Sequence, residues 1–179
     1  MSAHIDRAPV IPGAEAWSHE GSRKVGALCI HGFTGNPSSM RGVAEAFAAA
    51  GYHVELPRLP GHGTAVSDMI PTRWSHWIGE VEAAYQRLSA RVDTVVVAGL
   101  SMGGSLTLRT AIDHPEVAGI VCINPACQPQ AAEMIDMVKG MLDAGTETFA
   151  GIGSDIADPN VKESSYSDTP LAPLVSLVE

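Results

Sequence analysis

The chain has 179 residues, of which 45% are hydrophobic and 17% charged, as in an ordinary globular domain with a sizeable core. Its formal net charge of −9 at pH 7 argues against nucleic acid as a partner. Residues 1–130 hold 11 acidic and nine basic side chains, whereas residues 131–179 hold nine and two. This shift indicates a boundary near residue 130, although a solvated acidic face would also produce it.

The cysteines and the apolar runs indicate the cellular compartment in which we expect the protein. Cys29, Cys122 and Cys127 form no disulfide framework, and an odd count of this kind is typical of a reducing compartment. Met1–Gly13 lacks the apolar core of a signal peptide, and no apolar run approaches the length of a membrane span. We therefore expect a cytoplasmic protein without stable membrane insertion. No spacing of His, Cys and Asp resembles a metal site, and we expect no cofactor.

After an irregular arm over residues 1–13, strand and helix patterns alternate along the chain. In order they are a strand at 25–30, a helix at 38–50, a strand at 52–56, a helix at 72–90, a strand at 94–98, a helix at 102–114 and a strand at 119–123. The strands are short apolar runs of the kind that is buried on both faces, and this order predicts an α/β fold with a doubly wound parallel sheet.

The alternation of strand and helix patterns ends at Pro125. Residues 131–142 have helical spacing of apolar side chains, residues 143–169 resemble an acidic loop, and residues 171–178 have the composition of another helix. We expect residues 131–179 to cover a functional site rather than form a second domain, because so short a segment with few aromatic residues makes a poor separate core.

The most informative motif is Gly99-Leu100-Ser101-Met102-Gly103, which lies between a β-branched run and a helical pattern. A strand-to-helix turn this tight strains the backbone of the serine, and the flanking glycines let strand and helix pass closely. The Ser101 hydroxyl would then stand at a helix N-terminus, where free N–H groups favour a developing anion. The alternative, purely structural interpretation is that Ser101 only caps the helix that follows it.

A second motif, His31-Gly32-Phe33, follows the first long strand. A tetrahedral intermediate needs two backbone N–H donors, which Met102 and Phe33 are placed to supply. His31 could act as a general base, but a histidine at a strand end more often makes a structural hydrogen bond. The histidine of Leu59-Pro60-Gly61-His62-Gly63 is interpreted in the same structural way.

Three segments together resemble the α/β-hydrolase family, and within it the small bacterial carboxylesterases and monoacylglycerol lipases: Cys29–Pro37, Leu56–Gly63 and Ala98–Gly104. The resemblance implies an α/β-hydrolase-type, mostly parallel sheet with a small cap. Residues 1–124 would form the N-terminal part of the core, residues 125–169 the cap insertion, and residues 170–179 the start of the returning core helix.

The resemblance also implies a chemistry. Ser101 would be the nucleophile, with the Phe33 and Met102 N–H groups as the oxyanion hole, in cofactor-free hydrolysis of a small ester through an acyl-enzyme. We expect His31, Ile123 and Asn124 to border the substrate pocket. The same scaffold also serves thioesterases, peptidases and carbon–carbon hydrolases, and a non-catalytic ligand-binding module is a further alternative.

The chain departs from the family pattern after the cap. Two more strands, which in the family precede the catalytic Asp and His, have no counterpart, and all seven histidines precede residue 115. We therefore expect a C-terminally truncated chain, an N-terminal fragment or a truncated gene product, that lacks the last strands and is inactive for want of the triad acid and His. The strand at Gly119–Ile123 would become a sheet edge prone to self-association.

Overall fold

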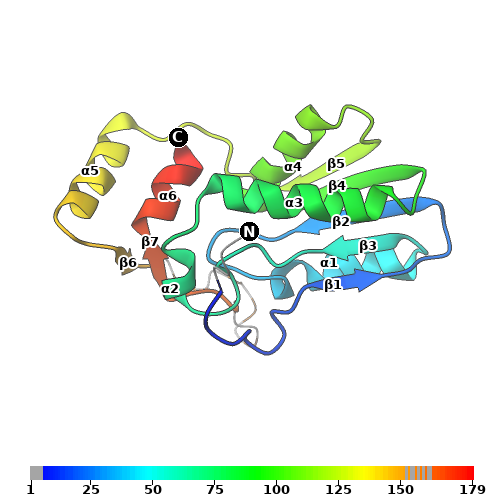
Figure 1. The fold of residues 1–179 in the computed structure, drawn as a ribbon, viewed down its shortest axis with the longest axis horizontal. Coiled ribbons are helices and arrows are strands. Elements are labelled where there is room, and N and C mark those ends of the chain that lie inside the picture. Colours follow the sequence, from blue (N-terminus) through cyan, green and yellow to red (C-terminus); the bar gives the residue numbers. More distant parts are fainter. Residues whose placement is uncertain (1–5, 152, 154–155, 157, 159, 161–162) are drawn as a thin grey trace.

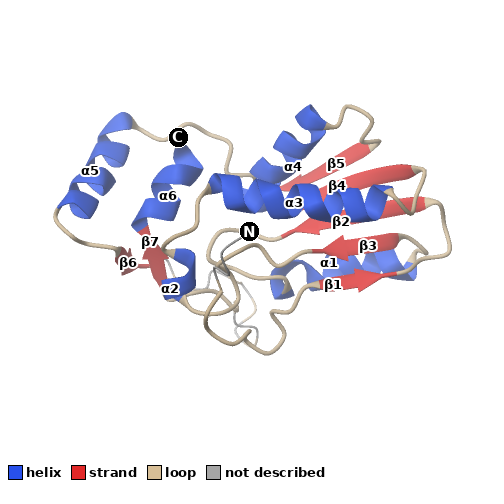
Figure 2. Cartoon of the chain, in the orientation of Figure 1, coloured by secondary structure: helices blue, strands red, loops and turns tan. Residues whose placement is uncertain are grey.

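The computed structural model describes residues 6–151, 153, 156, 158, 160 and 163–179. Within this part of the chain, five strands form the main sheet in the order β1-β3-β2-β4-β5. Their bounds are β1 Trp17–His19, β2 Val25–Ile30, β3 His53–Leu56, β4 Thr94–Leu100 and β5 Gly119–Ile123. All neighbours pair in parallel except β1, which runs antiparallel to β3 (Figure 2). The mostly parallel sheet is as predicted, and β1 was not predicted.

The helices occupy both faces of the sheet. Their bounds are α1 Ser38–Ala49, α2 Val66–Met69, α3 Trp74–Ser89, α4 Met102–Asp113, α5 Ala132–Asp143 and α6 Leu171–Val178. Helix α1 packs against β2 and β3 on one face, whereas α3 and α4 cover the other (Figure 1). Alternate residues of a strand point to opposite faces, and β2 follows this rule. Leu28 and Ile30 belong to the core beneath α3 and α4, and Ala27 and Cys29 to the core beneath α1.

The C-terminal part of the chain lies beyond the carboxyl ends of the parallel strands (Figure 1). There β6 (Thr148–Ala150) pairs antiparallel with β7 (Asp168–Pro170), and α5 packs against α6. Val138 of α5 is buried, whereas Met137 is exposed. The helix α5 therefore packs its buried side on α6.

Strand β5 forms one edge of the sheet, since no other strand in the described residues pairs beyond it. Ile120 and Val121 have exposed fractions of 43% and 49%, which is unusual for apolar residues of a parallel strand. Within the same described residues, no helix combines the length and apolar character needed to cross a membrane.

Candidate active site

Ser101 occupies a strained turn between β4 and α4. Its φ of 54° and ψ of −119° lie in a region that L residues rarely adopt. Besides the bonds that its carbonyl accepts from the first turn of α4, two backbone hydrogen bonds reach distant residues: its N–H donates to the Ile123 carbonyl (2.9 Å), and its carbonyl accepts from the Ala126 N–H (3.1 Å). The turn is thus fastened to the end of β5 and the loop that follows.

Glycines make this turn possible, as the sequence predicted. A Cβ on Gly103 would lie 2.3 Å from the Ile30 carbonyl oxygen, and one on Gly99 would collide with the backbone of Gly103. Any side chain at either position would therefore push α4 away from β2 and β4. The close approach brings the N-terminus of α4 next to the loop that follows β2.

A cavity of about 290 Å³ opens at Ser101. Its walls come from residues 32–35 and Ser39, from Leu100 and Asn124, and from Gly151, Gly153, Glu163, Ser165, Tyr166 and Thr169. Three non-glycine residues of the described chain have positive φ: Thr34 (59°), Ser101 and Asn124 (43°). All three line this cavity, each just beyond a different strand end. Backbone strain in the described chain is thus concentrated at one place, as is common at functional sites.

Two free backbone donors lie close to the serine. Met102 begins α4, and its N–H, like that of Phe33, donates to no acceptor among the described residues. A Cβ on Gly32 would lie 3.2 Å from the Ser101 Cβ, so the loop that carries Phe33 packs directly against the serine. Phe33 lines the cavity, and its ring packs edge-on against Trp77, with ring centroids 5.7 Å apart. The Met102 side chain is fully buried in the core.

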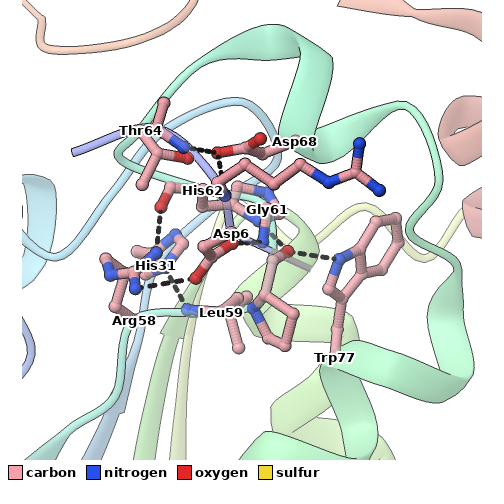
Figure 3. A network of polar contacts seen from close by, with 12 residues as sticks. Asp6, His31, Arg58, Leu59, Gly61, His62, Thr64, Asp68 and Trp77 are labelled. Carbon is pink, nitrogen blue, oxygen red and sulfur yellow. Dashed lines mark hydrogen bonds and ion pairs between the residues drawn. The ribbon is translucent and has the colours of Figure 1, made fainter. Parts of the chain in front are cut away.

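His31 is not part of the cavity, so the expectation that it borders the pocket is wrong. Its ring is fully buried, with Nδ1–H donating to the Gly32 carbonyl (3.0 Å) and Nε2 accepting from the Leu59 N–H (3.1 Å; Figure 3). Backbone groups on both sides therefore engage both ring nitrogens. Burial, together with the neighbouring His62, lowers the pKa of His31 to about 3.

His62 is equally enclosed, as the structural interpretation predicted. Its Nδ1–H donates to the Pro60 carbonyl (3.1 Å), and its ring packs edge-on against His31 and Trp77. Desolvation by burial lowers the pKa of His62 to about 4. Both histidines therefore stay neutral over the physiological range and brace the loop 57–63 against the end of β2.

Of the two residues at the end of β5 that were expected to border the pocket, only one does so. Asn124 lies at the cavity wall, where its positive φ turns it away from the strand. Ile123 is not at the wall, which corrects the expectation for it, because it is the last residue of the strand and its side chain packs into the core on the α1 side. Its contribution to the site is the carbonyl that accepts from the Ser101 N–H.

Several cavity residues come from positions that carried no sequence signal. Tyr166 is the largest of them: its hydroxyl donates to the Gly61 carbonyl (2.8 Å) and accepts from the Thr64 N–H (2.9 Å). Ser165 and Thr169 line the same wall. These residues lie in a stretch that resembled an acidic loop, and only contacts with distant parts of the chain place them at the serine.

No described histidine makes a hydrogen bond with the Ser101 side chain. Likewise, no group of three His, Cys, Asp or Glu side chains in the described chain is arranged to hold a metal ion. What the described residues bring together is a strained serine, two free N–H donors and a polar cavity.

A mostly parallel sheet with a serine on a strained strand-to-helix turn, Gly-x-Ser-x-Gly, defines the α/β-hydrolase class. Comparison with known proteins agrees. The family described as serine aminopeptidase, S33, matches residues 22–165. The chain belongs to this family and is by family a hydrolase.

Relatives show how much of such a protein the chain spans. A thermostable monoacylglycerol lipase of Bacillus sp. (strain H-257) is 47% identical, over 96% of this chain and 67% of its own length. A carboxylesterase of Bacillus subtilis (strain 168) is 28% identical, over 84% of this chain and 60% of its own. A solved structure from work on LipS and LipT, two metagenome-derived lipolytic enzymes, has a TM-score of 0.88 and 42% identity, covering 95% of this chain and 69% of that one. The chain spans about two thirds of the length of these relatives.

Proposed function

We propose that Ser101 is the nucleophile of a carboxylester hydrolase site of the carboxylesterase or monoacylglycerol lipase type. The observation that carries the proposal is the strained Ser101 beside the unpaired N–H groups of Phe33 and Met102. Attack of the Ser101 oxygen on an ester carbonyl puts negative charge on the carbonyl oxygen, and two N–H donors stabilise that charge. When the intermediate collapses, the bond between the carbonyl carbon and the alcohol oxygen breaks, the alcohol leaves with the proton that a base has taken from Ser101, and water hydrolyses the acyl-serine.

The cavity supports a small ester as substrate. Its lining residues include the hydroxyl-bearing Thr34, Ser39, Ser165 and Thr169, together with the apolar Phe33 and Leu100. Hydroxyl groups suit an alcohol portion that itself carries hydroxyls, and the apolar residues suit an acyl chain. The names of the two bacterial relatives, a monoacylglycerol lipase and a carboxylesterase, agree with this substrate class.

We further propose that residues 125–169 form a cap over the serine, since Gly151, Gly153, Glu163, Ser165, Tyr166 and Thr169 line the cavity. A cytoplasmic location is proposed from the thiols: all three cysteines are free, as expected in a reducing compartment.

The chain as it stands is proposed to be nearly inactive, because no described histidine is placed to take the Ser101 proton. Loss of a triad member lowers hydrolysis rates by several orders of magnitude. The same observation favours a second candidate function, a ligand-binding module that retains the cavity without turnover.

Exogenous imidazole tests the proposal by supplying the missing base. The 179-residue chain is incubated with 4-nitrophenyl butyrate at increasing imidazole concentration, with Ser101→Ala as the matched background. We expect an imidazole-dependent release of nitrophenol in excess of that seen with Ser101→Ala, in which free imidazole alone cleaves the ester, and a butyryl group on Ser101 in peptide mass spectrometry. Equal release by both proteins, with no acylated Ser101, would leave the binding module as the better account.

A further inference from the structure

Tyr166 joins three parts of the chain that are far apart in sequence. Its hydroxyl donates to the Gly61 carbonyl (2.8 Å) and accepts from the Thr64 N–H (2.9 Å), so both sides of the oxygen are used. Burial raises the pKa of Tyr166, which keeps the hydroxyl protonated as the Gly61 bond requires. The side chain is thereby fastened to the loop that also holds His31.

The backbone of Tyr166 reaches a different loop. Its N–H donates to the Thr34 carbonyl (3.1 Å), and two residues earlier Ser164 accepts, at its carbonyl and its hydroxyl, from the side-chain amide of Asn36. Residues 164–166 therefore lie along residues 34–36 at the rim of the cavity. The side chain of Tyr166 is therefore hydrogen-bonded to the loop 61–64, and its backbone is hydrogen-bonded to the loop 34–36.

These hydrogen bonds bear on the backbone conformation of Thr34. A β-branched residue with a φ of 59° is a genuine outlier, so Thr34 stays in that conformation only because surrounding contacts impose it. Two hydrogen bonds do so: the Tyr166 N–H donates to the Thr34 carbonyl, and the Thr34 hydroxyl donates to the Phe33 carbonyl (2.6 Å). Thr34 directly follows Phe33, whose N–H is one of the two free donors beside Ser101.

We propose that Tyr166 is a positioning residue for the oxyanion hole. The hydroxyl anchors the tyrosine to Gly61 and Thr64, the anchored backbone holds Thr34 in its strained conformation, and Thr34 fixes the direction of the Phe33 N–H toward the serine. The inference rests on the proposed function, because it assigns Tyr166 to the donor pair that the function requires. Tyr166 itself need not touch the reacting atoms.

The test uses Tyr166→Phe, which keeps the ring and removes the hydroxyl. Butylphosphonate, a tetrahedral anion that resembles the charged intermediate, is titrated into the ¹⁵N-labelled chain, and the amide resonances of Phe33 and Met102 are followed by NMR. We expect both amides to shift in the wild type, and the dissociation constant to rise at least tenfold in Tyr166→Phe. In the free variant, hydrogen exchange of the Tyr166 amide should be at least tenfold faster.

Tyr85→Phe is the matched control, since the Tyr85 hydroxyl also makes a hydrogen bond, to Glu116 (2.8 Å), but outside the cavity. Its phosphonate affinity should equal that of the wild type. Shifts of both amides with equal affinity and equal Tyr166 exchange in wild type and Tyr166→Phe would overturn the positioning role alone. A wild-type chain in which butylphosphonate moves neither amide would overturn the oxyanion assignment, and the positioning role with it.

Discussion

The α-carbon of Gly99 in β4 packs directly against the carbonyl oxygen of Gly103 in α4: a Cβ added to Gly99 would lie 2.0 Å from that oxygen. The atom in the way is backbone, so no rotamer change relieves the overlap. Strand and helix are therefore locked together at the turn that carries Ser101.

Gly99→Ala should accordingly destabilise the fold by about 3 kcal/mol or more, the upper range for overpacking, because α4 must move off the sheet. Urea unfolding followed by circular dichroism measures the change. Gly79→Ala in α3 is the matched control, since nothing lies within 4 Å of a Cβ there. Helix propensity predicts a gain of about 0.5–1 kcal/mol for that variant. A Gly99→Ala protein as stable as the wild type would mean that strand and helix are not locked.

Stability should fall steeply as the pH drops from about 6.5 toward 4. His31 and His62 have folded pKa values of about 3 and 4, so over this range they are neutral when folded and protonated when unfolded. The unfolded state binds more protons, and the free energy of unfolding therefore decreases with decreasing pH, by up to about 2.7 kcal/mol per pH unit for the pair. Unfolding in urea at a series of pH values measures the slope. His62→Gln should reduce that slope by about half, and an unchanged slope would contradict the assignment.

His114 should show the opposite sign. Its ring nitrogens pair with Glu82 (2.7 Å) and Glu116 (3.2 Å), and although burial lowers its pKa, the hydrogen bonds with these carboxylates outweigh it and raise the pKa. The stability that this group contributes is complete below its unfolded pKa and is lost as the pH rises through the folded value. His114→Gln should therefore cost most at pH 5.5 and least at pH 9. A cost that is the same at both values would contradict the ion pairs.

The N-terminal arm should be held by Asp6. Its carboxylate pairs with Arg58 (2.8 Å) and accepts from the Gly61 N–H (2.8 Å), as Figure 3 shows. Asp6→Ala leaves both donors without this partner, which should cost about 1–3 kcal/mol. Glu15→Ala is the control, because Glu15 also accepts from a backbone N–H, that of Gly13, but on the exposed surface. Limited proteolysis of the arm should accelerate for Asp6→Ala only, and equal cleavage of the two variants would count against the role of Asp6.

The edge strand β5 should drive self-association of the isolated chain. Ile120 and Val121 expose apolar surface on a strand whose outer edge pairs with no other strand in the described part of the chain, a combination that templates pairing with a second chain. Sedimentation velocity should detect dimers or larger species whose population falls when both residues are replaced by Lys. Ile112→Lys, at an exposed position of α4, should leave association unchanged. A wild-type chain that remains monomeric at high concentration would contradict this expectation.

Local patterns account for the parts of the fold that the sequence predicted. The run Val25–Ile30 is continuously apolar between polar turns, so its strand begins and ends where the pattern does. Strand β1 has only Trp17 as an apolar signal, and its position depends on pairing with β3. The four-residue α2 lies in a Pro- and Gly-rich loop and is too short to show periodicity.

Local sequence likewise predicts one part of the candidate site and not the rest. The strained turn at Ser101 follows from residues 99–103 alone, and sequence sufficed to predict it. Tyr166 was missed because its partner Thr64 lies 102 residues away, a contact that no local pattern encodes. His31 was misplaced because its direction is decided by the Leu59 N–H on a separate loop. Local chemistry thus identifies the serine, whereas long-range hydrogen bonds decide which side chains surround it.

The hydrogen bonds that hold Ser101 carry a consequence for synthesis on the ribosome. Two of its partners, the Ile123 carbonyl and the Ala126 N–H, come from a part of the chain that is made well after the serine. While only β2, β3 and β4 have emerged, these two bonds are absent, and only the local contacts of the turn, such as the Gly104 N–H on the Ser101 carbonyl, act on the serine. The turn has its full set of hydrogen bonds once residue 126 has left the exit tunnel and β5 has paired with β4. A nascent chain stalled before that point would carry the complete Gly-x-Ser-x-Gly sequence with a serine turn that is not yet fastened to β5.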